Sequence, residues 1–101
     1  MVFVYTTCRD MAEAKDLGRK ILKARVAACI NVWAIESIYY DGDELKEGTE
    51  AVLLIKTNEP KVAEIEEFLT KHHSYGVPFV GMLDVRRLNR EYKEWMTTVI
   101  R

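Results

Sequence analysis

The sequence predicts an α+β fold: a four-stranded antiparallel sheet with two helices, followed by a third helix at the C-terminus. Three observations support this prediction. The 101 residues are enough for a single domain, residues 1–101, and the 49% apolar and 31% charged content is typical of a globular protein. Segments rich in β-branched and aromatic residues alternate with segments whose apolar residues recur every three or four positions. Turn and capping residues separate these segments.

The first strand and the first helix are separated by a helix-start signal. Residues 2–7 are mostly β-branched or aromatic, which favours a strand. Asp10 and Glu13 have the spacing of a capping box, in which the first side chain caps the helix and the second reaches back to free backbone amides. The apolar stripe of the helix that follows contains Ala14, Leu17, Ile21 and Ala24.

The middle of the chain is predicted to form a β-hairpin. Residues 26–40 are largely apolar and aromatic, and residues 51–57 form a second such run. Asp41-Gly42-Asp43 lies between them, and an Asp-Gly pair tolerates the positive φ that tight hairpin turns require. We therefore expect the second and third strands here.

A second helix is predicted to begin after Asn58. Asn58 can cap its N-terminus, and Pro60 is favourable in a first turn because its missing amide hydrogen is not needed there. Its apolar stripe reads Val62, Ile65, Phe68 and Leu69. Gly76 and Pro78 cannot continue it, so we expect it to end near Ser74.

The last predicted elements are a strand over residues 79–85 and a helix capped by Asn89. The complete order is β-α-β-β-α-β plus a terminal helix, which is the ferredoxin-like pattern. Right-handed crossovers place both main helices on the same face of the sheet.

Residues 51–55, Ala-Val-Leu-Leu-Ile, are nevertheless apolar at both alternating positions. Because an exposed apolar face of that size is unusual in a monomer, we expect other subunits to cover it.

Six short segments of the chain match segments of a known protein family in sequence, order and spacing. They are residues 5–7, 23–32, 37–42, 54–57, 73–78 and 92–95. On these pieces the sequence resembles the CutA-type divalent-cation tolerance proteins over nearly its whole length. The resemblance implies a ferredoxin-like homotrimer packed sheet against sheet, cytoplasmic localisation, and a role in tolerance of copper and other divalent metals.

The chain departs from the family pattern at three positions. Ser74 replaces the proline of the usual His-Pro-Tyr sequence, Phe79 stands where a carboxylate commonly follows Val-Pro, and Asp41 replaces a tryptophan before the hairpin glycine. Ligand chemistry that depends on that carboxylate or that indole is not expected to carry over.

His73, His72 and Cys8 are the candidate metal ligands. Histidine suits Cu(II) and Zn(II), and His73 matches the motif histidine of the family. Successive helical residues are rotated by about 100°, so we expect His72 to face the core and His73 the rim. A further ligand would come from Cys8 or Tyr5 at the end of the first strand. Cys8 and Met11 also form a Cys-x-x-Met pair, a soft donor set that would suit Cu(I).

Each of these residues also has a purely structural interpretation. His72 can be a hydrogen-bonded core residue, His73 a cation at a helix C-terminus, and Met11 a packing residue. Cys29 is expected to be a small buried hydrophobe. The aromatic residues of the hairpin, Trp33, Tyr39 and Tyr40, either pack against a neighbouring subunit or line a ligand cleft between subunits.

Composition and charge exclude several other functions. A net charge of -1 gives no reason to expect nucleic acid as a partner. Two cysteines make no disulfide framework, and no apolar run approaches the roughly 20 residues that span a bilayer. The N-terminus lacks the basic region of a signal peptide.

The sequence therefore predicts a trimeric cytoplasmic protein that binds Cu(II) or another divalent metal weakly, with no enzymatic activity and no organic cofactor. The alternatives are a small-molecule sensor similar to PII-type signalling proteins and an enzyme of unknown type.

Overall fold

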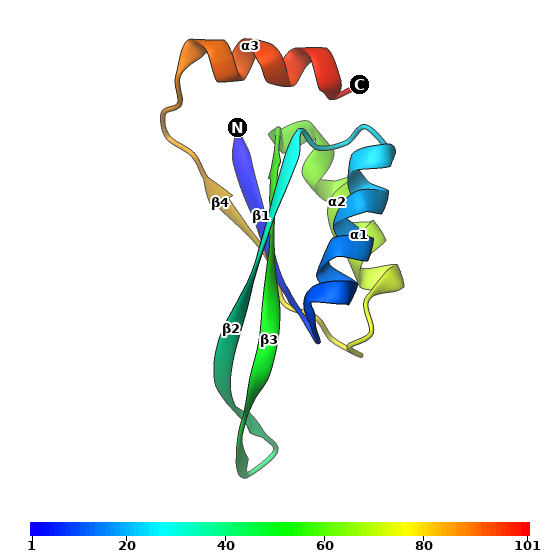
Figure 1. Cartoon of the computed structure of the whole chain (residues 1–101), viewed down its shortest axis with the longest axis vertical. Coiled ribbons are helices and arrows are strands. Elements are labelled where there is room, and N and C mark those ends of the chain that lie inside the picture. The colour runs from blue at the N-terminus through cyan, green and yellow to red at the C-terminus, as the bar shows by residue number, and fades with distance from the viewer.

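Four antiparallel strands in the order β2-β3-β1-β4 form one sheet in the computed structural model, which describes residues 1–101 (Figure 1). This order and the two helices beside the sheet confirm the predicted ferredoxin-like fold. The elements are β1 (Val2–Cys8), α1 (Met11–Lys23), β2 (Cys29–Asp41), β3 (Glu44–Thr57), the short 3₁₀ helix η1 (Glu59–Lys61), α2 (Val62–His72), β4 (Val80–Asp84) and α3 (Arg90–Val99).

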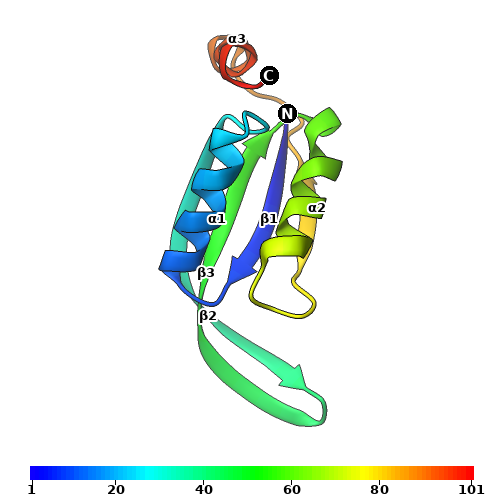
Figure 2. The same ribbon diagram turned by 90° about the vertical axis from the view of Figure 1, so that its right-hand side faces the viewer.

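Helices α1 and α2 lie side by side on one face of the sheet (Figure 2). The strand β1 shows why this face is the core: its even-numbered residues are buried, and its odd-numbered residues are only partly buried. Gly18 lets α1 approach the sheet closely, because a Cβ atom there would overlap the side chain of Ile30. The buried apolar core consists of Val4, Cys8, Ala14, Leu17, Ile21, Val26, Ala27, Ala51, Leu53, Ile55, Ile65 and Leu69.

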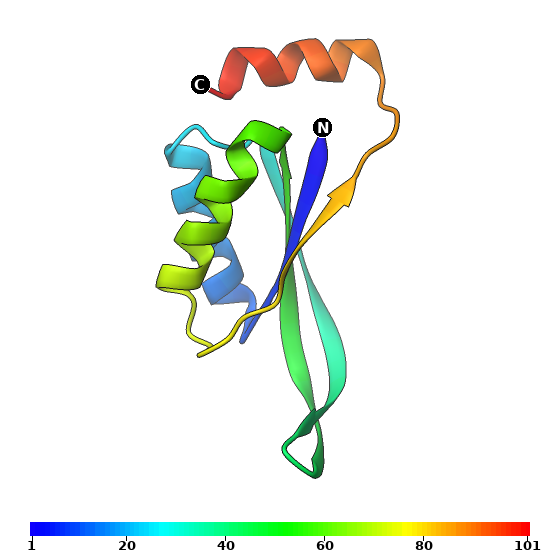
Figure 3. The same ribbon diagram turned by 180° about the vertical axis from the view of Figure 1, so that it is seen from behind.

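The opposite face of the sheet has no helix over it. Helix α3 lies across one end of the sheet, as Figures 1 and 3 show from opposite sides. Large apolar side chains are exposed on the sheet and the hairpin, and also on the segment after α2 and on α3. The most exposed are Trp33, Ile38, Tyr39, Tyr40, Leu45, Val77, Phe79, Met82, Leu83 and Trp95.

Strands β2 and β3 form a hairpin that projects beyond the rest of the sheet (Figure 1). They pair from Cys29 opposite Lys56 to Asp41 opposite Glu44, and Gly42 makes the turn with φ of +64°. The third strand begins seven residues earlier than the predicted Ala51. The polar segment 44–50 lacks a strand composition, and it is extended because it pairs with β2 along its whole length.

The other element boundaries differ from prediction by a few residues. Strand β2 begins at Cys29 rather than at Val26, because the chain is still turning after α1: Arg25 has φ of 63°, and Val26 and Ala27 lie buried in the connection. The 3₁₀ helix η1 precedes α2, and neither Asn58 nor Asn89 makes a capping hydrogen bond through its side chain. The predicted capping box is confirmed in part: the Glu13 amide donates to Asp10 Oδ1 at 2.8 Å.

Candidate functional site

Cys8, Glu13 and His73 meet where β1 ends, α1 begins and α2 ends. One possible ligand atom from each residue lies within 4.8 Å of the other two. We call this set the Cys8–Glu13–His73 cluster. Cys8 is the last inward-facing residue of β1, Glu13 lies in the first turn of α1, and His73 is the residue that follows α2. The side chains are almost inaccessible, with exposed fractions of 0%, 8% and 9%.

The two histidines point the opposite way from the prediction. His72 is exposed, its Nδ1 lies 3.0 Å from the Phe68 carbonyl oxygen, and its ring stacks on that of Phe68. His73 is the buried one. The prediction extended the helical rotation to residue 73, but α2 ends at His72 and His73 has extended backbone angles of -71° and 145°. The change in backbone conformation turns the His73 ring inward.

Both ring nitrogens of His73 are already hydrogen-bonded. Its Nε2 lies 2.8 Å from the Thr7 carbonyl oxygen, which can only accept, so Nε2 carries a proton. Its Nδ1 lies 3.0 Å from the Tyr75 backbone nitrogen and accepts that N–H. A neutral imidazole therefore ties the end of β1 to the segment after α2.

The Glu13 carboxylate is held by four contacts. Oε1 accepts the Arg9 amide at 3.0 Å and the Ser74 hydroxyl at 2.9 Å, while Oε2 accepts the Ser74 amide at 3.0 Å. The Arg9 guanidinium lies 3.6 Å away. Burial alone would raise the pKa of Glu13, but the hydrogen bonds from Arg9 and Ser74 bring it below its ordinary value. Proline at position 74 has no amide hydrogen, so Ser74 adds bonds that the usual family residue lacks.

Cys8 is a protonated thiol in this environment. Burial, followed by the negative charges of Glu13 and Glu50, raises its pKa to about 12. Met11 packs against the core, and Tyr5 alternates to the other side of β1 from Cys8. Neither residue belongs to the cluster. Cys29 was expected to be fully buried, and this prediction is wrong. Cys29 lies on the edge strand β2 and is partly accessible to solvent.

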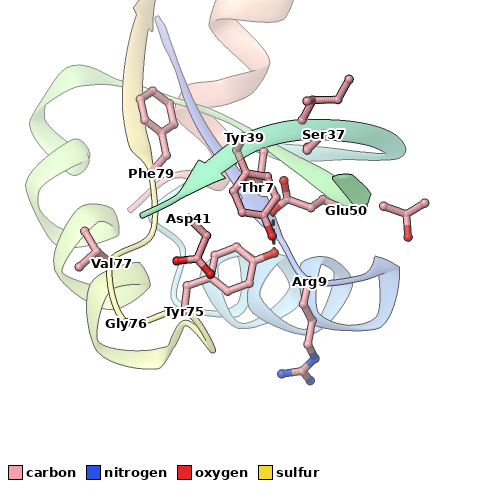
Figure 4. Close-up of a pocket in the computed structure, with 13 residues that line it drawn as sticks. Thr7, Arg9, Ser37, Tyr39, Asp41, Glu50, Tyr75, Gly76, Val77 and Phe79 are labelled. Carbon is pink, nitrogen blue, oxygen red and sulfur yellow. Dashed lines mark hydrogen bonds between the residues drawn. The ribbon is translucent and has the colours of Figure 1, made fainter. Parts of the chain in front are cut away.

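An open pocket of about 950 Å³ lies on the other side of the end of β1. We call it the Glu50 pocket (Figure 4). The hairpin contributes Ser37, Tyr39 and Glu50, and the segment after α2 contributes Tyr75. The Tyr75 hydroxyl donates to the Glu50 carboxylate at 2.6 Å. The remaining lining residues are Thr7, Arg9, Ile38, Asp41, Gly48, Thr49, Gly76, Val77 and Phe79.

Two of the three departures from the family pattern, Asp41 and Phe79, line this pocket. Glu13 and Glu50 were not identified as candidate ligands from the sequence. The capping-box spacing identified Glu13 only as a helix cap, and Glu50 lies in a polar segment with no pattern of its own.

The small ferredoxin-like sheet, its long hairpin and its one uncovered face define the structural class of this chain. The sequence model of the family described as CutA1 divalent ion tolerance protein matches residues 2–99, and the chain belongs to that family. The family is named for ion tolerance and is not a known enzyme family.

Individual relatives agree with this assignment. A divalent-cation tolerance protein CutA of Thermococcus kodakarensis is 34% identical over 99 residues, which cover 98% of this chain and 95% of that protein. The crystal structure of CutA1 from Pyrococcus horikoshii is 30% identical, with a TM-score of 0.96, and covers 100% of this chain and 99% of that chain.

Two relatives contradict the predicted cytoplasmic localisation. The structure from Archaeoglobus fulgidus, 26% identical with a TM-score of 0.96 and full coverage of both chains, is described as a periplasmic divalent cation tolerance protein. A relative from Oryza sativa, 32% identical over 94% of this chain and 54% of its own length, is described as chloroplastic. Membership of the family therefore fixes no compartment, and the predicted cytoplasmic localisation was wrong. No helix of the chain has the length and apolarity needed to cross a membrane.

Proposed function

We propose that this chain serves divalent-cation tolerance by binding the cation directly but weakly, as a homotrimer of 101-residue single-domain subunits that catalyse no reaction. The observation that supports binding is the Cys8–Glu13–His73 cluster, whose sulfur, oxygen and nitrogen donors lie within 4.8 Å of one another. This mixed donor set suits Zn(II) and Cu(II). His72 lies outside the cluster, so we assign it no ligand role.

Weak binding follows from the bonds that the ligands already make. A metal would have to displace the thiol proton of Cys8 and take one His73 nitrogen from Thr7 or Tyr75. It would also compete with Ser74 for the Glu13 carboxylate. Each lost hydrogen bond to a charged group costs roughly 1.5–3 kcal/mol, which reduces the net affinity. Affinity should rise with pH, because binding releases protons.

Calorimetric titration with Zn(II) and Cu(II) tests this proposal. We expect native protein to bind one ion per subunit and to release at least one proton, measured by repeating the titration in buffers of different ionisation enthalpy. The variants Cys8→Ser and His73→Ala should lose binding, and His72→Ala is the matched control that keeps it. Unfolding curves of each variant establish that it is folded. Equal affinity in native protein and Cys8→Ser would reject the cluster as the site.

The homotrimer is supported by the uncovered face of the sheet. Trp33 on β2 and Leu83 on β4 point to this face and are 43% and 52% exposed. Burying such an apolar surface between subunits is favourable by about 25 cal/mol for each Å². Light scattering after size exclusion should give three times the 11.7 kDa chain mass. A monomer mass would reject this part of the proposal.

Small-molecule binding in the Glu50 pocket is a second candidate function, as in a PII-like sensor. A specific observation favours it: the pocket has a volume of about 950 Å³, far more than a single ion requires. A thermal-shift screen of cationic, neutral and anionic metabolites at millimolar concentration tests it. The absence of any shift across the screen would reject this candidate.

A further inference from the structure

We infer that the Glu50 pocket takes a small organic cation, an amine with a short apolar part, with Glu50 as its counter-charge. This inference rests on the second candidate function above and specifies the class of ligand. It depends on the charge balance of the pocket, on the size of the pocket and on its aromatic lining.

The charge balance leaves Glu50 without a cationic partner. Asp41, the other carboxylate of the lining, pairs with Lys46 at 2.8 Å. The one arginine of the lining, Arg9, pairs with Asp10 at 3.5 Å and Glu13 at 3.6 Å, and its guanidinium points away from Glu50 in Figure 4. No ion pair of the chain includes Glu50.

Hydrogen bonds from neutral hydroxyl groups, and not a neighbouring cation, stabilise the ionised form of Glu50. Burial would raise its pKa, but hydrogen bonds from Ser37, Tyr75 and Thr7 bring the pKa below its ordinary value. The closest of these donors is the Tyr75 hydroxyl at 2.6 Å. Glu50 is therefore the one ionised carboxylate of the lining that has no cationic partner. An anionic ligand would be repelled by that charge, and a neutral ligand would leave it unpaired.

The aromatic lining favours an organic cation over a metal ion. The rings of Tyr39, Tyr75 and Phe79 line the pocket (Figure 4). Aromatic faces attract alkylammonium groups and cover their apolar carbons. A hard divalent cation needs about six oxygen ligands at short distance, which one carboxylate in a wide pocket does not provide.

Titration with butylammonium tests the inference, monitored by amide chemical shifts of Gly48, Thr49 and Gly76 in the full-length protein. Butan-1-ol and butyrate provide neutral and anionic probes of similar size, and sodium and magnesium chloride at matched ionic strength control for charge alone. We expect butylammonium to bind at least tenfold more tightly than the other probes. Glu50→Gln should remove this preference, whereas Asp16→Asn, at an exposed carboxylate outside the pocket that pairs with Lys20 at 3.0 Å, should change affinity less than twofold.

Different failures have different meanings. Equal butylammonium affinity in native protein and Glu50→Gln, or tighter binding of butyrate or butan-1-ol, would overturn the inference and leave the pocket as a small-molecule site. Binding of no probe of any charge, together with a negative metabolite screen, would overturn both. A lysine or arginine of another subunit next to Glu50 is the competing occupant. If Glu50→Gln weakens the oligomer in light scattering and native protein does not bind butylammonium, that occupant is correct and the inference fails.

Discussion

The Cys8–Glu13–His73 cluster and the Glu50 pocket adjoin the same strand end, yet their carboxylates differ: Glu13 has the cationic partner Arg9, and Glu50 has none. In the cluster the donor atoms are close together, but His73 is already bonded to Thr7 and Tyr75, and Glu13 to Ser74 and Arg9. The Cys8 thiol keeps its proton. In the pocket Glu50 accepts the Tyr75 hydroxyl at 2.6 Å, but its charge has no cationic partner. Closeness of ligand atoms is therefore a poor measure of readiness to bind. The bonds that must be broken first decide the affinity.

Tyr75 connects the two regions. Its backbone amide donates to His73 Nδ1 at 3.0 Å, and its hydroxyl donates to Glu50 at 2.6 Å. The cluster and the pocket lie on opposite faces of β1, because Cys8 faces the helices and the preceding residue, Thr7, faces the other side. A metal that displaced the amide of Tyr75 would thus alter a wall of the pocket. The difference between the regions can be tested on each side separately.

The largest expected effect is on the reactivity of Cys8. Its pKa is raised from 9.0 to about 12 in the folded protein, so the thiolate fraction at pH 8 falls about a thousandfold relative to the unfolded chain. Alkylation by iodoacetamide, followed by peptide mass spectrometry, should be slower by about that factor in buffer than in urea. Cys29 is the internal control, because it is partly accessible and should react first. If the alkylation rates of Cys8 in buffer and in urea differed by less than tenfold, the cluster would be open to solvent.

Replacing Glu13 should have the next largest effect. Glu13→Gln loses charge-assisted hydrogen bonds from Arg9 and Ser74, and we expect a loss of about 2 kcal/mol in the free energy of unfolding at pH 7. The folded pKa of Glu13 lies below its ordinary value of 4.5, so this stabilisation is present above pH 4.5 and is lost as the pH falls through the folded pKa. Urea unfolding of both proteins at pH 7 and at acidic pH measures this change.

The control for this change is Asp16→Asn on the same helix. Asp16 is exposed and pairs with Lys20 one turn away at 3.0 Å, so its replacement should cost less than about 0.5 kcal/mol. A difference between native protein and Glu13→Gln that is equally large in acid would show that the loss comes from packing and not from the ionised carboxylate.

The parts of the fold that depend on local patterns could be predicted from the sequence. The strand and helix order followed from periodicity, and the start of α1 followed from the spacing of Asp10 and Glu13. The early start of β3 at Glu44 could not be predicted, because segment 44–50 is extended by its pairing with β2 and not by its own composition.

The candidate site was predictable only in part for the same reason. Cys8 and His73 were identified by residue type, but the inward orientation of His73 depends on where α2 ends. Glu13 joins the cluster only because α1 packs beside α2, and Glu50 faces Tyr75 only after the sheet has formed. Ser74 was noted in the sequence only as a departure from the family pattern, and its contribution, two hydrogen bonds to Glu13, depends on the position of α1 beside the segment after α2.

The smallest expected effect is that of Asp41→Asn at the tip of the hairpin. Asp41 pairs with Lys46 at 2.8 Å, but both side chains are well exposed to water, where such pairs add little stability. The midpoint of thermal unfolding should therefore not change measurably, with or without added salt. Glu50→Gln, which replaces the charged acceptor of the Tyr75 hydroxyl bond with a neutral and weaker one, should lower the midpoint in the same assay. If Asp41→Asn lowered the midpoint as much as Glu50→Gln, the hairpin tip would be part of the ordered wall, and the assignment of the pocket's fixed charge to Glu50 alone would be wrong.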